Sequence, residues 1–280
     1  MWSLCKLLPF PLLGIKDNME KSSEALTWCS FLLLEKMQLL MLLLAFFLLP
    51  RAEAGEIISG HEAKPHSRPY MAYIQINSTE ICGGFLIQED FVLTAAHCLE
   101  MQIEVTLVAH NIEEQEDTQQ VFRVQNAFPH PDYNQNKHIN DIMLLKLEKK
   151  AKLTKAVQLL KLPKGRAQVN PGTQCQVTGW GTFTPEGTYP ATLQEVEMIV
   201  LKDEKCEELL PKYYDRATEI CVGDPKIKNT LLKGDSGGPL VCNNVAQGIV
   251  SYGPKNGTTP FVFTKVSCFL RWIKKTMKHS

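Results

Sequence analysis

The stretch Lys233-Gly-Asp-Ser-Gly-Gly-Pro-Leu240 restricts the fold and the chemistry of this chain more than any other segment. Asp235 directly precedes Ser236, and glycines stand close to the serine on both sides. Such a loop can expose one hydroxyl while its backbone N–H groups point at a shared spot, where the oxyanion of an acyl transfer would form. The stretch therefore predicts a nucleophilic serine at position 236.

Two upstream segments supply the partners that such a serine needs. A serine hydroxyl is a poor nucleophile at neutral pH and requires an adjacent base. His97, within Thr94–Cys98, can serve because the histidine side chain has an unperturbed pKa of about 6.5. Asp141, within Asn140–Leu145, would hold the imidazole in the right tautomer and stabilise the cation that forms. Along the chain the order is histidine, aspartate, serine, which is one of the orders in which catalytic triads occur.

The other histidines give no comparable signal. We expect surface or packing roles for all of them, namely His61, His66, His110, His130, His138 and His279. The chain has no H-E-x-x-H zinc spacing, so the sequence predicts no catalytic metal and no other cofactor.

Further motifs lie on both sides of these three segments. They are Pro65–Ala72, Ala109–Ile112, Asp141–Leu147, Lys233 before Gly234, and Trp272–Lys278. In them, and in the triad segments, the chain resembles the chymotrypsin-like serine proteases over residues 57–278. Within that family it is most similar to the granzymes, closest to granzyme B and granzyme H-like granule proteases. The resemblance implies a serine endopeptidase that hydrolyses peptide bonds through a Ser-His-Asp acyl-enzyme mechanism.

Short apolar or alternating runs recur along the chain with turn residues between them. They lie at 71–76, 85–87, 91–94, 105–108, 174–178, 195–201, 239–241, 247–251 and 261–266. So many short strands without helical patterns between them predict an all-β sandwich or barrel. The C-terminus differs, because Val266, Phe269, Leu270, Ile273 and Met277 follow helical spacing with lysines on the other face. We expect one terminal amphipathic helix. The resemblance implies two six-stranded antiparallel β-barrels with the active site between them.

The N-terminal segment resembles a targeting signal. Leu39–Leu49 is an apolar run of eleven residues, whereas a membrane span needs about 20. We predict a signal peptide with small residues before its cleavage point and no membrane span; a membrane anchor is the other interpretation. The expected divisions are an alternative-start extension at 1–36, the signal peptide at 37–54, an activation dipeptide at 55–56 and the protease domain at 57–280, with an N-terminal barrel at 57–160 and a C-terminal barrel with the helix at 161–280. A genuine extension that is cleaved off is the alternative for residues 1–36.

Charge is balanced, with 30 Lys+Arg against 30 Asp+Glu, and it stays near neutral after residues 1–56 are removed. We therefore expect no nucleic-acid partner and only weak binding to granule proteoglycan. Lysines cluster at 149–155 and 274–278, where a solvated surface is the expected role.

The expected partners are protein or peptide substrates and an activating dipeptidyl peptidase, with serpin-type inhibitors as candidates. We expect a monomer.

Seven of the nine cysteines lie after residue 56, as suits a secreted, disulfide-bonded chain. The resemblance implies the pairs Cys82–Cys98, Cys175–Cys242 and Cys206–Cys221. Most chymotrypsin-like enzymes have a further bridge beside the nucleophile, but Leu231 and Leu232 stand there in this chain, as in granzymes. Cys268 is left over, and we expect a buried thiol on the last helix, with an intermolecular disulfide as the alternative.

The resemblance also assigns roles near the serine. The N–H groups of Gly234 and Ser236 would form the oxyanion hole. Asp235 would pair with the new α-ammonium of Ile57 once Gly55-Glu56 is removed. Since no Arg or Lys precedes Ile57, a dipeptidyl peptidase rather than a trypsin-like cleavage would remove the dipeptide.

The pocket for the substrate side chain is less well defined by sequence. The resemblance sets Thr230 at its floor, Ser251, Tyr252 and Gly253 along one wall, and Phe261 at the back. Granzyme B has an arginine, which binds aspartate, where this chain has Phe261. We therefore expect a chymase-like preference for Phe, Tyr, Leu or Met. Lys233, beside the oxyanion hole, either favours acidic residues after the scissile bond or is simply solvated.

Four other positions carry expectations. Asn77 and Asn256 begin glycosylation sequons. Ser59 and Val108 replace glycines that are usual in the family, and Val108 would be strained if its site requires positive φ.

The leading hypothesis is therefore an active, secreted serine endopeptidase of lymphocyte or mast-cell granules. The alternative is a catalytically weak homologue that acts as a granule binding or antimicrobial protein. Such homologues lose triad members, whereas this chain keeps His97, Asp141 and Ser236. A digestive or plasma protease is a third interpretation, against which the acidic dipeptide and Leu232 argue.

Overall fold

The chain separates into two units, Met1–Glu56 and Ile57–Ser280. The computed structural model describes residues 60–76, 80–165, 169–182, 189–223, 234–254 and 259–280, which all belong to the second unit. Among these residues no helix has the length and apolar character needed to cross a lipid bilayer.

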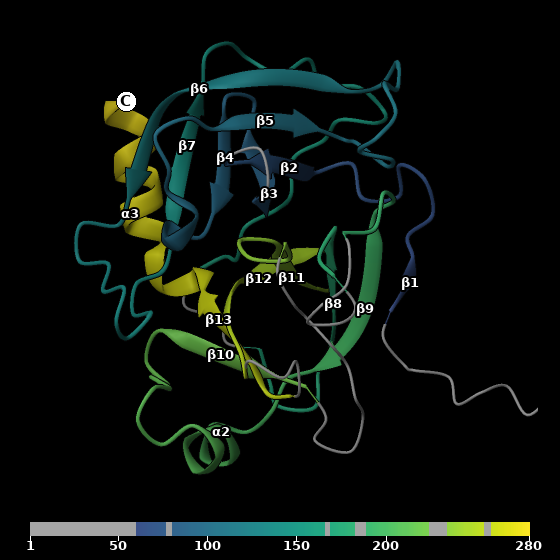
Figure 1. Cartoon of the computed structure of the whole chain (residues 1–280). Helices are drawn as coiled ribbons and strands as arrows, with labels where there is room; N and C mark the ends of the chain where they lie inside the picture. Colours follow the sequence, from purple (N-terminus) through teal and green to yellow (C-terminus); the bar gives the residue numbers. More distant parts are fainter. Residues whose placement is uncertain (1–59, 77–79, 166–168, 183–188, 224–233, 255–258) are drawn as a thin grey trace, which may run out of the picture. The chain divides into compact units, whose positions relative to one another are not determined.

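The first half of the described chain forms a closed antiparallel barrel (Figure 1). Its strands are β2 (Met71–Gln75), β3 (Ile81–Gln88), β4 (Phe91–Thr94), β5 (Glu104–Leu107), β6 (Gln120–Pro129) and β7 (Met143–Leu147). Around the barrel they follow the order β2-β3-β4-β7-β6-β5. β4 is buried along its whole length, because its apolar and β-branched side chains fit the packed interior of a barrel.

The second half, together with β1 from the start of the described chain, forms a seven-stranded antiparallel sheet. Its strands are β1 (His61–Glu62), β8 (Gln174–Gly179), β9 (Gln194–Ile199), β10 (Glu219–Val222), β11 (Pro239–Cys242), β12 (Val245–Tyr252) and β13 (Phe261–Lys265). The order is β1-β9-β8-β11-β12-β13-β10. A single bridge between Val200 and Val222 brings β10 against the residue after β9. The all-β fold predicted from sequence is confirmed, and β1 adds a seventh strand to the second sheet.

Among the described residues, two α-helices accompany the sheets, not one. The predicted terminal helix is present as α3 (Val266–His279), which buries Val266, Phe269 and Ile273. These side chains join the same hydrophobic cluster as the first barrel, and each contributes roughly 1.5–3 kcal/mol by burial. α3 contacts β12, and Figure 1 shows the helix in yellow with the C-terminus at its end. The sequence reading missed α2 (Asp203–Leu209), because this short helix buries only Cys206 and so lacks an apolar stripe.

The expectation of a buried Cys268 is wrong. The thiol is exposed, and its Sγ lies 3.2 Å from the carbonyl oxygen of Ala217. Helical geometry explains the difference. Val266, Phe269 and Ile273 share the buried stripe of α3, and position 268 lies about 100° away from 269 around the helix axis.

Val108 follows β5 and has φ +59°, in the left-handed region that a β-branched residue rarely adopts. Its side chain is nonetheless buried in the first barrel's cluster. The turn places Ala109 and His110 beside the second sheet, where the His110 carbonyl accepts bonds from the Leu193 N–H at 2.8 Å and the Trp180 indole N–H at 3.3 Å. A strained residue therefore sits at a junction between the two sheets.

We expect Val108→Gly to be more stable than Val108→Ala by about 1 kcal/mol, although glycine usually destabilises relative to alanine. The alanine variant keeps a buried methyl group, and glycine loses more backbone entropy on folding, so both of these effects favour alanine. Higher stability of the glycine variant would therefore come from relief of the backbone strain. Urea unfolding of the two purified variants measures it. A free energy of unfolding that is higher for the alanine variant would show that position 108 carries no such strain.

Candidate active site

His97 lies on η2 (Ala96–Cys98), a short 3-10 helix that directly follows β4. Its imidazole is partly exposed, while Ala96 and Cys98 on either side are buried. The Cys82–Cys98 disulfide ties this turn to β3. The histidine therefore stands on a rigid support with one ring edge accessible.

Asp141 is fully buried and lies just before β7. Its Oδ2 is 2.7 Å from His97 Nδ1, and its Oδ1 accepts the His97 backbone N–H at 2.9 Å. Two hydroxyls from the second sheet also hold it. Ser251 Oγ donates to Asp141 Oδ2 at 2.5 Å, and Thr264 Oγ1 donates to its backbone oxygen at 2.8 Å. The carboxylate thus fixes both the position and the tautomer of the imidazole.

Burial alone would raise the pKa of Asp141, but the hydrogen bonds and charge of His97, with the Ser251 hydroxyl, outweigh it and lower the pKa. A lowered carboxyl pKa means that the ionised form is the one the fold stabilises. That stabilisation is present at neutral pH and is lost only as pH falls through the lowered pKa. The aspartate is therefore a permanent anion at the pH where the histidine would act.

Ser236 is partly exposed on a tight turn between the two sheets. Its carbonyl oxygen accepts a 2.7 Å bond from the Gly83 N–H of β3 and lies 3.9 Å from Cys98 Sγ, next to His97. Gly237 has φ +80°, and a Cβ there would lie 2.1 Å from Thr94 Oγ1. Only glycine lets this turn approach the first barrel so closely. The turn thereby brings the serine beside the segment that carries the histidine.

Gly234 and Asp235 are both buried beside the serine. Gly234 has φ +100°, and a Cβ there would lie 2.8 Å from a ring carbon of Tyr189. The Gly181 N–H donates to Asp235 Oδ1 at 3.0 Å. A Cβ at Gly181 would come within 2.3 Å of the same carboxyl group. The glycine spacing therefore makes room for a buried carboxylate directly behind the peptide that precedes Ser236.

Each residue of the segment Ser251–Gly253 touches a different part of the site. Ser251 bonds to Asp141, as described above. The Tyr252 ring stacks on the His138 ring, with centroids 5.1 Å apart and planes inclined by 27°. A Cβ at Gly253 would lie 2.3 Å from Cδ1 of Phe261, whose ring is buried. The phenyl group therefore occupies space next to this wall.

The structure brings together His97, Asp141, Ser236, Gly234, Asp235 and the wall of the expected pocket. Other expected site residues lie outside the described residues, namely Ile57, Thr230, Lys233 and the sequon residues Asn77 and Asn256; the unusual Ser59 also lies outside them. The disulfides that the resemblance implied, Cys82–Cys98, Cys175–Cys242 and Cys206–Cys221, are present.

Sequence reasoning missed three residues close to this site. His138 was expected to have a surface or packing role, and it does pack on Tyr252, but the sequence did not predict that this contact lies beside the candidate triad. Its position three residues before Asp141 was the one available signal. Tyr189 borders Gly234, and Glu219 bonds to Tyr252, as described below. Neither has a sequence signal, because both reach the site through contacts between distant segments.

The similarity to known proteins agrees with this geometry. Residues 57–273 match the trypsin family. The chain is 64% identical to granzyme B of Homo sapiens over 245 residues, which is 86% of this chain and 99% of that protein. It is 60% identical to granzyme H of Homo sapiens, again over 86% of this chain and 99% of that protein. A solved structure described as "Structure of GrC" superposes with a TM-score of 0.77 at 55% identity, covering 80% of this chain and 100% of that one. With this fold, these contacts and these relatives, the chain belongs to the trypsin family of serine endopeptidases and, within it, to the granzyme subfamily.

Proposed function

We propose that this chain is a secreted granule protease that cleaves peptide bonds through an acyl-enzyme on Ser236, after removal of Gly55-Glu56. The observation that carries the proposal is the buried Asp141 carboxylate, which bonds to both the backbone N–H and the Nδ1 of His97. This arrangement leaves Nε2 of the imidazole as the nitrogen able to accept a proton. The Ser236 turn, bonded to Gly83 of β3, supports an approach of the hydroxyl to that nitrogen.

The chemistry proceeds in two acyl transfers. Ser236 Oγ attacks the substrate carbonyl carbon while His97 accepts the hydroxyl proton. The N–H groups of Gly234 and Ser236 stabilise the oxyanion of the tetrahedral intermediate. His97 then donates its proton to the leaving amine, and the carbon–nitrogen bond breaks. Water, deprotonated by His97, attacks the ester and releases the acid and the serine hydroxyl. Throughout, Asp141 stabilises the imidazolium without accepting its proton.

An apolar pocket is the proposed determinant of specificity. Phe261 is buried against Gly253, and neither position 251 nor position 261 holds an acidic or a basic residue. A ring at the back of the pocket favours Phe, Tyr, Leu or Met over charged residues, because an unpaired charge buried there would lose its hydration. The ring also makes the pocket shallow.

Activity-based labelling tests both parts of the proposal. A fluorophosphonate probe should label the enzyme that begins at Ile57, and Ser236→Ala should abolish labelling, because only an activated serine forms the phosphonyl ester. Diphenyl phosphonates that carry a Phe or Leu side chain should then label faster than one that carries Asp. Intact-mass spectrometry and gel fluorescence measure the adduct.

Two outcomes would contradict the proposal separately. An unlabelled, folded enzyme would favour the alternative of a granule binding protein without catalysis. Faster labelling by the Asp phosphonate would leave catalysis intact but overturn the apolar pocket.

Storage in a lymphocyte or mast-cell granule is part of the same proposal. Its support is the similarity to proteins named granzyme and, at 55% identity, to one named mast cell protease 3 from Ovis aries. The expected protein partners remain a dipeptidyl peptidase for activation and serpin-type inhibitors, with weak proteoglycan binding. Division of the chain at residues 36, 54, 56 and 160, and glycosylation at Asn77 and Asn256, remain predictions.

A further inference from the structure

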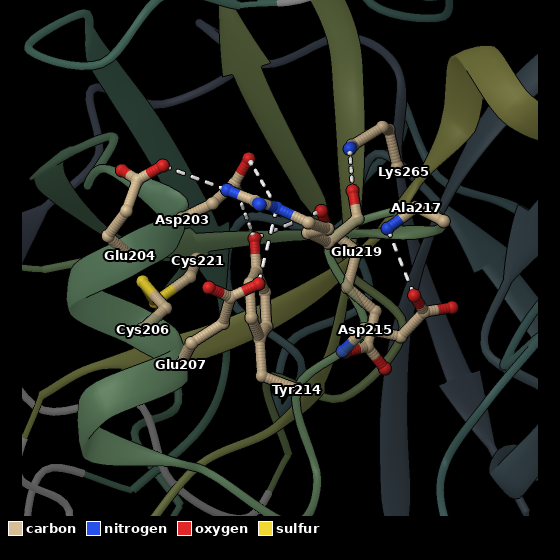
Figure 2. Close-up of polar contacts among 11 residues, drawn as sticks. Asp203, Glu204, Cys206, Glu207, Tyr214, Asp215, Ala217, Glu219, Cys221 and Lys265 are labelled. Carbon is tan, nitrogen blue, oxygen red and sulfur yellow. Dashed lines mark hydrogen bonds and ion pairs between the residues drawn. A yellow bond between two sulfur atoms is a disulfide. The ribbon is translucent and has the colours of Figure 1, made fainter.

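Glu219 is a buried acid behind the active-site wall, at the start of β10. Figure 2 shows it among the polar contacts of the loop that joins α2 to β10, which the Cys206–Cys221 disulfide closes. Its Oε2 accepts the backbone N–H of Asp215 at 2.8 Å and the hydroxyl of Tyr252 at 3.1 Å. Its Oε1 is buried with no hydrogen-bond partner among the described residues. Burying a carboxyl group with one oxygen unpaired costs free energy, so the presence of Glu219 at this position suggests a role for it.

Tyr252 connects this acid to the catalytic centre. Its hydroxyl end bonds to Glu219, and its ring face stacks on His138. The preceding residue, Ser251, bonds to Asp141 Oδ2. Two neighbouring residues at the end of β12 are therefore held by two different buried acids. Burial, with the charge and hydrogen bond of Glu219, raises the pKa of the Tyr252 hydroxyl, which consequently stays protonated and acts as the donor.

We propose that Glu219 is a positioning residue: its carboxylate holds the Tyr252 hydroxyl and so fixes the Tyr252–His138 stack as a preformed surface for an extended peptide substrate. The inference rests on the proposed function, since it concerns the wall of that same site. Without the hydrogen bond, an aromatic side chain at the edge of the site would sample other rotamers. Binding would then require ordering the ring, and the cost would appear in KM rather than in the chemical step.

The strength of this anchor depends on the ionisation of Glu219. Burial, the largest influence, raises its pKa to about 7, against the lowering effect of the bonds from Asp215 and Tyr252. Above about pH 7 the carboxylate forms a charge-assisted bond with the tyrosine, and below it the neutral carboxyl forms a weaker one. Substrate KM should therefore fall as pH rises from 6 to 8. The titratable and charged groups around Glu219 are Asp215 and Tyr214 on its own loop, Asp203 of α2 behind Tyr214, Tyr252 of β12, Lys265 of β13, and Asp141.

The test compares Tyr252→Phe, Glu219→Gln and the double variant on a tetrapeptide amide and on a single-residue ester. At pH 8 we expect Tyr252→Phe to raise KM for the tetrapeptide about fivefold with a small change in kcat, the size of one lost hydrogen bond. Glu219→Gln, which mimics the neutral acid, should raise it about threefold. The double variant should be no worse than Tyr252→Phe, since both changes break one contact. The pH 6 to 8 change in KM should vanish in all three, and the single-residue ester should respond less.

A matched control is Tyr214→Phe, which removes another hydroxyl from the same cluster. The Tyr214 hydroxyl bonds to Asp203 Oδ1 at 2.5 Å and approaches the Glu219 carbonyl at 3.4 Å, but bonds to no carboxyl oxygen of Glu219. It should leave KM and its pH dependence unchanged. Additive effects in the double variant, or an unchanged tetrapeptide KM in Tyr252→Phe, would overturn the positioning role. Failure of the proposed function is distinguishable, because the enzyme without substitutions would then not react with a fluorophosphonate.

Discussion

Asp141→Asn is expected to lower kcat on peptide amides by a factor on the order of 10⁴, which corresponds to about 5.5 kcal/mol of transition-state stabilisation. The carboxylate accepts the His97 backbone N–H, the imidazole Nδ1–H and the Ser251 hydroxyl. Asparagine would replace one carboxylate oxygen by an NH2 group, which donates hydrogen bonds. At Oδ2 that group would face the His97 Nδ1–H and the Ser251 hydroxyl, which are themselves donors. It therefore favours the tautomer whose proton is on Nε2, where the serine proton must go. Stopped-flow or steady-state hydrolysis of a chromogenic amide measures the loss.

Ser251→Ala provides the graded control for this prediction. It removes one donor from Asp141 and leaves both contacts to His97 in place. We expect a loss of about tenfold, the size of one hydrogen bond to a charged group. Thermal unfolding should show that both variants fold. If Asp141→Asn retained more than a tenth of the activity, the buried aspartate would be a structural residue and another group would orient the base.

Retention of one extra residue before Ile57 is expected to reduce kcat/KM by a factor on the order of a hundred or more. Asp235 is buried between Gly179 and Gly181, with Gly181 N–H on its Oδ1. A buried carboxylate favours a cation as partner, and the ammonium of Ile57 is the cation that processing would create. With an added methionine, the charge lies one residue away. The peptide between Gly234 and Ser236 would then lose the support that orients the oxyanion-hole N–H groups.

Asp235→Asn in the Ile57-started enzyme tests the same link from the other partner. The neutral amide cannot pair with the ammonium, so the variant should be about as weak as the extended form. Adding the methionine to this variant should cost little more, because the pair is already broken. Both kcat/KM on a peptide ester and the rate of fluorophosphonate labelling measure the effect. Full activity of the extended enzyme would contradict the role of the new N-terminus.

The sequence predicted many, though not all, of the strands whose side chains are mostly buried; β7 is almost entirely buried and was not among the expected strands. Phe91–Thr94 and Phe261–Lys265 are almost entirely buried, so their apolar runs are visible in the sequence. The long strand β6 was missed because most of its residues are exposed or partly exposed, which leaves no apolar run or clear alternation. β10 was missed for a different reason. It begins with Glu219, an acid that is buried only because Tyr252 and Asp215 satisfy it.

The same distinction holds for the site. Ser236, His97 and Asp141 each lie within a short motif of adjacent residues, and such a motif can be identified from the sequence of that segment alone. The Glu219–Tyr252–His138 contacts join residues that are far apart in the chain. Tyr252 was expected along the pocket wall, but the sequence did not predict its contacts with Glu219 and His138. Cys268 was misplaced because its environment depends on which face of α3 meets the barrel. Residue spacing predicts which face of the helix is apolar, but it does not predict whether a small thiol at the edge of that face is buried or exposed.

The docking of α3 has a consequence for biosynthesis. Val266, Phe269 and Ile273 complete a cluster that otherwise consists mainly of first-barrel residues. These residues follow the barrel strands in the chain, so a ribosome makes the barrel of residues 71–147 long before the helix that covers it. The growing chain therefore carries an unfinished apolar surface until α3 has been made and packs against the barrel. Truncations that remove α3 should therefore leave the apolar side of the first barrel uncovered, and chaperones should bind such chains for longer than the full-length chain.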